Sequence, residues 1–188
     1  MRHKYQTLGV ILSRKDHGEA NVLVSILTPE LGLVRARVQG VRKSGAKLAT
    51  GITTLAISSC TLVRGKEGWR LVGALNERND VRALSFEGRE VLGRVAFLID
   101  RLVKGESRDA RLFTVFYTLL NTLCAYTGSE YEPYEYLAVL YILSLQGVEG
   151  GEGLGNTYAF TEDDLKYVRE HSREVISRIN TGIHASGL

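Results

Sequence analysis

The sequence predicts an α+β protein in which a small five-stranded β-barrel is followed by a bundle of α-helices. Short runs rich in Val, Ile, Leu and Thr, separated by turn residues, fill the first 84 residues, whereas apolar residues recur at helical spacing from Ser85 onward. The charge changes at the same place: residues 1–84 hold 14 Lys or Arg against 6 Asp or Glu, and residues 85–188 hold 10 against 15. We therefore predict two domains, 1–84 and 85–188.

Five candidate strands account for most of the first domain. Turn signals at DHGE, TPELG and RGKEG separate several of them. The strands are predicted at residues 7–14, 20–28, 33–39, 55–64 and 69–74. Five short strands in about 75 residues suit a closed barrel, and the oligonucleotide-binding (OB) fold is the common five-stranded form. The small residues of segment 44–53 predict a short helix or a loop across the barrel end.

The second domain is predicted to contain four helices. They are expected at residues 91–102, 109–126, 134–145 and 161–179. The third is apolar nearly all round and should lie at the centre of the bundle, and Ser129 and Glu132 have capping-box spacing just before it. The glycine-rich segment 147–155 is expected to be a mobile loop, and the tail from Thr181 is expected to be frayed.

The most informative stretch for function is ELGLVRARVQGVRKSGAK, residues 30–47, because five cations follow Glu30 and no acidic residue does. Arg35 and Arg37 share one side of the predicted strand, while Val34 and Ala36 share the other. A buried face and a cationic face should result, followed by a basic loop that suits phosphate. A solvated sheet face is the alternative. The predicted nucleic-acid-binding residues are Arg35, Arg37, Arg42, Lys43 and Lys47, with Arg14 and Lys15 as weaker candidates.

Enzymatic and metal-dependent functions find little support. Residues 40–47 approach a nucleotide-binding P-loop, but Ala46 follows the second glycine where Lys is required, and Leu48 stands where a shifted alignment requires Ser or Thr. No nucleophile, base and orienting residue form a recognisable set, so we predict no enzyme activity. We also expect no metal and no cofactor, because the histidines lack ligand spacing with one another or with Cys. They are His3, His17, His171 and His184.

The sequence predicts a cytoplasmic protein without a membrane anchor. The N-terminal stretch has no apolar run long enough for a signal peptide. The longest apolar stretch, residues 137–145, has about half of the ~20 residues needed to cross a bilayer. Cys60 and Cys124 lie far apart, and we interpret them as two buried, reduced thiols.

The order of parts from Gly9 onward resembles the N-terminal domain of the bacterial recombination mediator family RecO. These parts are a strand ending in Ser13-Arg14, a turn with Gly18-Glu19, a strand ending LTPELG, a strand running into Gly40 and a basic loop closing at Lys47. The resemblance continues through LVGALNER and FTVFYTLLNTLCAYTGSEYEPYEYLAVLYILSLQG, which is similar to the family's helical domain. Many family members carry paired CxxC zinc ligands after this helix. The corresponding GVEGGEGLGNTYAF has no cysteine. The chain therefore resembles either a short member that has lost the zinc motif, as some members have, or a divergent relative with altered partners.

The resemblance implies a non-enzymatic role in homologous recombination and DNA repair. RecO-like proteins bind single- and double-stranded DNA, anneal complementary strands and, with RecR, help load recombinase onto strands coated with single-stranded-DNA-binding protein. The family's helical domain also receives the acidic, hydrophobic C-terminal tail of that coating protein. The turn between the first two helices offers cations that could bind the carboxylates of such a tail, and Phe113 or Leu112 could contact its apolar end. Alternatively, these cations simply cap the first helix and solvate the turn. They are Arg101, Lys104, Arg108 and Arg111.

Two other functional classes remain open from the residues alone. An RNA-binding barrel would share the charge and the fold, and a protein-interaction module would use the basic face to dock an acidic partner. Only Tyr5 and Trp69 are aromatic within residues 1–84, so a row of base-stacking platforms is not expected. We interpret Trp69 as a core or rim residue beside a hairpin.

Overall fold

The computed structural model describes residues 3–188 except 18–20, 42–47, 105–107 and 156. It separates into two compact units. One contains the residues up to Arg82 together with the short segment that ends at Phe113. The other contains residues 83–104 and 114–188. The predicted domain boundary between residues 84 and 85 stays a prediction, but the fold class is confirmed as α+β, with the five-stranded barrel preceding the main helices.

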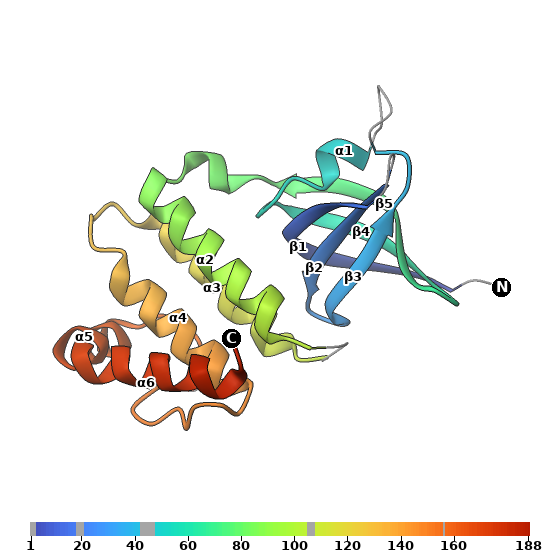
Figure 1. Ribbon diagram of the computed structural model, residues 1–188. Coiled ribbons are helices and arrows are strands. Elements are labelled where there is room, and N and C mark those ends of the chain that lie inside the picture. The colour runs from blue at the N-terminus through green and yellow to red at the C-terminus, as the bar shows by residue number, and fades with distance from the viewer. Residues whose placement is uncertain (1–2, 18–20, 42–47, 105–107, 156) are drawn as a thin grey trace. The chain divides into compact units, whose positions relative to one another are not determined.

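The first unit is a closed barrel with the strand order β1-β2-β3-β5-β4 (Figure 1). Its strands are β1 (Lys4–His17), β2 (Asn21–Thr28), β3 (Gly32–Val38), β4 (Ile57–Gly65) and β5 (Gly68–Arg78). Every neighbouring pair is antiparallel except β3 and β5, which are parallel. All five predicted strands therefore exist, although β1 and β5 extend several residues beyond their predicted ends.

The barrel core follows from the alternation along β3. Val34, Ala36 and Val38 are fully buried, whereas Arg35 and Arg37 between them are exposed. The helix α1 (Leu48–Gly51) closes this core together with the fully buried Ile52. Gly51 is required there because a Cβ atom would lie 2.3 Å from the carbonyl oxygen of Ala74. Of the two alternatives predicted for segment 44–53, a short helix or a loop, the helix is found at residues 48–51.

The remaining helices follow β5. They are the 3-10 helix η1 (Asp80–Ala83), α2 (Phe86–Leu102), α3 (Ala110–Ala125), α4 (Glu132–Leu145), α5 (Glu162–Glu170) and α6 (Ser172–Ser186). α4 packs against α2, α5 and α6, and its residues from Leu137 to Leu143 are all buried (Figure 1). The predicted central position of this helix is confirmed. Within the described residues, no helix is both long and apolar enough to cross a membrane.

Three details of the helical region differ from the sequence-based expectations. α4 begins at Glu132 after Tyr131, without a side-chain cap, so the capping box predicted at Ser129 is wrong. The predicted fourth helix is two helices, because the backbone at His171 leaves the helical conformation between α5 and α6. The tail is not frayed: α6 continues to Ser186 and ends at Gly187, whose φ of 78° is a left-handed cap.

The two cysteines have different environments. Cys60 is buried in the barrel, and burial raises the pKa of its thiol to about 11. Cys124 is exposed, which contradicts its predicted burial. The buried stripe of α3 runs through Leu112, Val115, Phe116, Leu119, Leu120 and Leu123. This stripe has helical spacing, and Cys124 falls just outside it.

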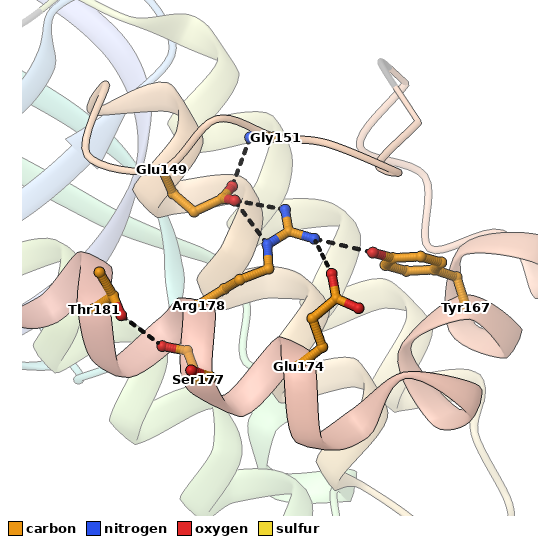
Figure 2. Close-up of polar contacts among 7 residues, drawn as sticks. All are labelled: Glu149, Gly151, Tyr167, Glu174, Ser177, Arg178 and Thr181. Atoms are coloured by element: carbon orange, nitrogen blue, oxygen red, sulfur yellow. Dashed lines mark hydrogen bonds and ion pairs between the residues drawn. The ribbon is translucent and has the colours of Figure 1, made fainter.

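The glycine-rich segment 147–155 is anchored by an ion pair, in contrast to the mobile loop expected from its composition. Glu149 accepts hydrogen bonds from Arg178 of α6, at 2.8 Å from Nε, and from the backbone N–H of Gly151, at 2.7 Å (Figure 2). Arg178 also donates to the hydroxyl of Tyr167 at 3.0 Å. Burial is the largest single influence on the pKa of Arg178 and lowers it, but the hydrogen bond to Glu149 and the charges of Glu149, Tyr167 and Glu174 together raise the pKa above its ordinary value.

Candidate nucleic-acid interface

A row of cations crosses the outer face of the barrel. Lys15 of β1 lies opposite Leu23 of β2, Leu23 lies opposite Arg37 of β3, and Arg37 lies opposite Arg70 of β5. Residues directly opposite one another in a sheet point to the same side. Because Arg37 is exposed on the side away from the core, Lys15 and Arg70 project outward with it. Arg35, two residues before Arg37, adds a fourth cation to the same face.

The weaker candidates Arg14 and Lys15 are separated by the pleat. Arg14 lies opposite Val24, which lies opposite Ala36, and both apolar residues belong to the barrel core. Arg14 is therefore on the same side of the sheet as these core residues, although its own side chain is exposed. Lys15 joins the outer row and Arg14 does not. The other three predicted residues, Arg42, Lys43 and Lys47, lie outside the described residues.

The β4–β5 hairpin adds cations that were not among the predicted site residues. A pocket of about 830 Å³ surrounds its tip. Among the residues that the structure describes, four Lys or Arg residues line it and Glu67 is the single acidic one. These cations are Arg37, Arg64, Lys66 and Arg70. The turn signal RGKEG contained two of them, but only the parallel pairing of β3 with β5 brings the hairpin beside Arg37.

Arg37 and Arg70 of this pocket form polar contacts within the barrel. Arg37 forms an ion pair with Glu67, with 3.2 Å between Nη1 and Oε2, and Arg70 donates to Oε1 of Gln39 at 2.7 Å. The Glu67 side chain is 85% exposed and that of Arg37 is 47% exposed, so water screens the pair. Such exposed pairs contribute about 0–1 kcal/mol. A phosphate group can therefore displace the Glu67 carboxylate at little cost.

We expect Glu67→Gln to raise the affinity for DNA by about threefold, because it removes the carboxylate that competes for Arg37. Titration with labelled DNA at low salt measures this, and the gain should shrink as salt screens the charges. Glu77→Gln, near the other end of β5, is the matched control for the change in net charge. An equal gain in DNA affinity for both variants would show that the change in net charge, and not the release of Arg37, causes the effect.

The predicted partner-binding cations lie in two different environments. Arg101 is exposed on α2, with its guanidinium 5.7 Å from the centre of the Phe97 ring, and Lys104 is exposed just after that helix. Arg108 is also exposed. Arg111 forms two hydrogen bonds to Asp109, at 2.8 and 2.9 Å, which lower the pKa of that carboxyl group.

The apolar receptor proposed beside these cations needs correction. Leu112 is fully buried and therefore unable to receive a partner, and Phe113 is partly buried. A different apolar groove, of about 710 Å³, lies beside Arg101 within the second unit. Its apolar lining includes Phe97, Leu98, Val139, Ile179 and Ile183. Phe97 is 66% exposed, which makes it the most accessible of the large apolar side chains in this groove.

The side chains present do not fit a structural zinc site. Within the described ranges, no three His, Cys, Asp or Glu side chains lie close enough together to hold a metal ion. A structural zinc ion needs four ligands, typically Cys or His, and the buried Cys60 has a pKa of about 11, which disfavours the thiolate that zinc requires. The absence of zinc stays a prediction.

Chelation should leave the melting temperature of the purified protein unchanged, since no structural ion would be removed. The measurement is thermal unfolding with and without excess chelator, accompanied by elemental analysis of the untreated protein. One zinc ion per chain, or a lower melting temperature after chelation, would contradict the prediction.

The closed five-stranded barrel with a cationic outer face places this chain among proteins of the OB-like class. Within that class, residues 1–73 match the family model described as "Recombination protein O N terminal". The barrel therefore matches the N-terminal domain of the RecO family, as its order of strands and basic loop indicated.

Several curated relatives are proteins named DNA repair protein RecO. The one from Roseiflexus sp. (strain RS-1) is 34% identical over 124 residues, which cover 64% of this chain and 42% of that protein. The one from Dehalococcoides mccartyi (strain CBDB1) is 33% identical over 97 residues, or 47% of this chain and 38% of the relative. The one from Bacillus cereus (strain AH187) is 25% identical over 172 residues, which cover 88% of this chain and 65% of that protein. The matches thus span roughly two fifths to two thirds of these relatives.

Proposed function

We propose that this protein is a non-enzymatic mediator of homologous recombination and DNA repair that binds single- and double-stranded DNA through the outer face of its barrel. The observation that carries the proposal is the row of Lys15, Arg37 and Arg70 across three strands, with Arg35 beside it. The similarity of the chain to proteins of the RecO family supports the same role. Cations on a rigid sheet contact phosphates without reading base sequence, so binding is expected to be weakly sequence-selective.

The same surface suits the annealing of complementary strands. Annealing requires that the bases stay free to pair while the phosphate charges are neutralised. Trp69 is only 6% exposed and belongs to the barrel core, as predicted, so it offers no open platform for stacking. A mainly electrostatic contact therefore holds two strands close together without occupying a run of bases on either one.

An annealing assay tests the function directly. Two complementary labelled strands are mixed with the protein, with and without bound single-stranded-DNA-binding protein, and duplex formation is followed in time. We expect faster annealing in both cases, and further assistance to recombinase loading when a RecR-like protein is added. Protein that binds neither single-stranded nor double-stranded DNA would refute the proposal.

A protein-interaction module is the second candidate, and the Arg37–Glu67 pair favours it because the basic face already accepts a carboxylate. Competition separates the candidates. Unlabelled single-stranded DNA, RNA of the same sequence and an acidic peptide are each used to displace labelled DNA. Stronger displacement by the peptide would favour a protein partner, and stronger displacement by RNA would favour an RNA-binding barrel.

The acidic C-terminal tail of single-stranded-DNA-binding protein is proposed to bind beside Arg101, with its apolar end in the groove at Phe97. We expect Arg101→Ala to lower the affinity for a labelled tail peptide about tenfold, because a charge-assisted contact is lost. The comparison is a variant with both Arg108→Ala and Arg111→Ala, since Arg111 is already paired with Asp109. Equal affinity of the wild type and the Arg101 variant would refute this site.

A further inference from the structure

The pocket at the tip of the β4–β5 hairpin combines an aromatic ring with several cations. Its volume of about 830 Å³ lies within the range of ~300–1,000 Å³ typical of small-ligand sites. Tyr5 and Trp69 both line it, with their ring centres 5.2 Å apart and their planes at 74°. The guanidinium of Arg64 lies 5.2 Å from the centre of the Trp69 ring. The pocket therefore has an ordered aromatic wall.

Tyr5 is the ring in this wall that a ligand can reach. Trp69 is 6% exposed, with Tyr5 packed edge-on against it and Arg64 lying over it. Tyr5 is 37% exposed and is braced by Trp69, so its orientation is held without a ligand. A ring held in place offers a stacking surface at low entropic cost, and every nucleobase has a face that stacks on it.

The cations of the pocket supply the second half of a nucleotide site. The same volume is lined by Arg37, Arg64, Lys66 and Arg70, and Glu67 is the single opposing charge among the described residues of the lining. A single unstacked nucleotide can bind with its base stacked on an aromatic face and its phosphate contacted by cations, when both lie in one pocket. A duplex presents phosphates but keeps its bases stacked inside, so only an unpaired strand satisfies both halves.

We propose that this pocket is a subsite for one unstacked nucleotide of a single DNA strand, with the base on Tyr5 and the phosphates on the arginines of the hairpin and of β3. This inference rests on the proposed function, in which the outer face of the barrel binds DNA. It adds a means of distinguishing single strands from duplexes, because the cation row by itself contacts only phosphates, which both forms of DNA present. A single stacking position also leaves the remaining bases free to pair.

The test compares Tyr5→Leu with Tyr5→Phe. Leucine keeps an apolar contact with Trp69 but has no aromatic face, whereas phenylalanine keeps the face. Each protein is titrated at one salt concentration with a short single strand, with the matching duplex and with RNA of the same sequence. Tyr5→Leu is expected to bind the single strand about tenfold more weakly and the duplex unchanged, and Tyr5→Phe is expected to behave as the wild type.

Trp69, the sole tryptophan of the chain, provides a second readout in the protein without any label. Its fluorescence should change when the single strand binds and should change less with the duplex, because only an unstacked base contacts Tyr5. Equal losses for single strand and duplex in Tyr5→Leu, or no loss at all, would overturn the subsite. Tighter binding of RNA than of DNA would overturn its assignment to DNA.

Failure of the subsite is distinguishable from failure of the proposed function. If Tyr5→Leu keeps its full affinity while charge reversal at Arg35 and Arg37 removes binding, the barrel face binds DNA and the subsite is wrong. If the wild type binds neither single-stranded nor double-stranded DNA, both the proposed function and the subsite are refuted. Thermal unfolding of each variant confirms that the barrel is intact.

Discussion

Reversing both arginines of β3, Arg35→Glu together with Arg37→Glu, is expected to lower the affinity for single-stranded DNA at least a hundredfold. Each lost contact between an arginine and a phosphate costs about 1.5 kcal/mol or more, and the new carboxylates also repel the strand. If about five phosphates are neutralised, the logarithm of the wild-type affinity should fall against the logarithm of salt concentration with a slope of roughly −3 to −4. The double variant should have a slope shallower by about 1.4.

This prediction needs a matched control, because four units of negative charge weaken binding to any polyanion. Lys166→Glu with Arg173→Glu makes the same change in net charge at two exposed positions on α5 and α6. The control should keep most of its affinity. Arg35 and Arg37 are exposed, so their reversal should leave the melting temperature close to that of the wild type. A folded double variant with unchanged affinity would exclude the β3 face.

Replacing Arg178 with Met should lower the free energy of unfolding of the helical unit by about 3 kcal/mol. The side chains of Arg178 and Glu149 are only 16% and 9% exposed, so removing the cation leaves a nearly buried carboxylate without its charged partner. The bond from Arg178 to Tyr167 is lost as well (Figure 2). The measurement is urea unfolding followed by helical circular dichroism.

Two further variants define the origin of this cost. Arg173→Met lies on the same helix at an exposed position and should cost less than about 0.5 kcal/mol. Combining Arg178→Met with Glu149→Leu should recover part of the loss, since no uncompensated charge is then buried. If Arg178→Met proves no more destabilising than Arg173→Met, the ion pair does not stabilise the anchored loop.

Local patterns in the chain predicted most of the fold. Alternation along residues 33–39 identified β3 and its two faces, because side chains of a strand point to opposite sides by geometry alone. Thr161 marked the start of α5, where its hydroxyl accepts a hydrogen bond from the backbone N–H of Asp164 at 3.2 Å. Sequence patterns did not predict features that depend on tertiary contacts. An example is His171, where the chain turns between two helices of similar periodicity.

The sequence by itself determined that the chain has a basic barrel followed by an acidic helical region, and that Arg35 and Arg37 share a solvent-facing side of one strand. These properties depend on residues close together in the chain. Only the tertiary structure decided that Arg70 lies beside Arg37, that Lys15 joins them while Arg14 does not, and that Glu149 holds Arg178. Each of these depends on the register between strands or on the packing of distant segments. Many registers satisfy the same local pattern, and closure of the barrel core selects one of them.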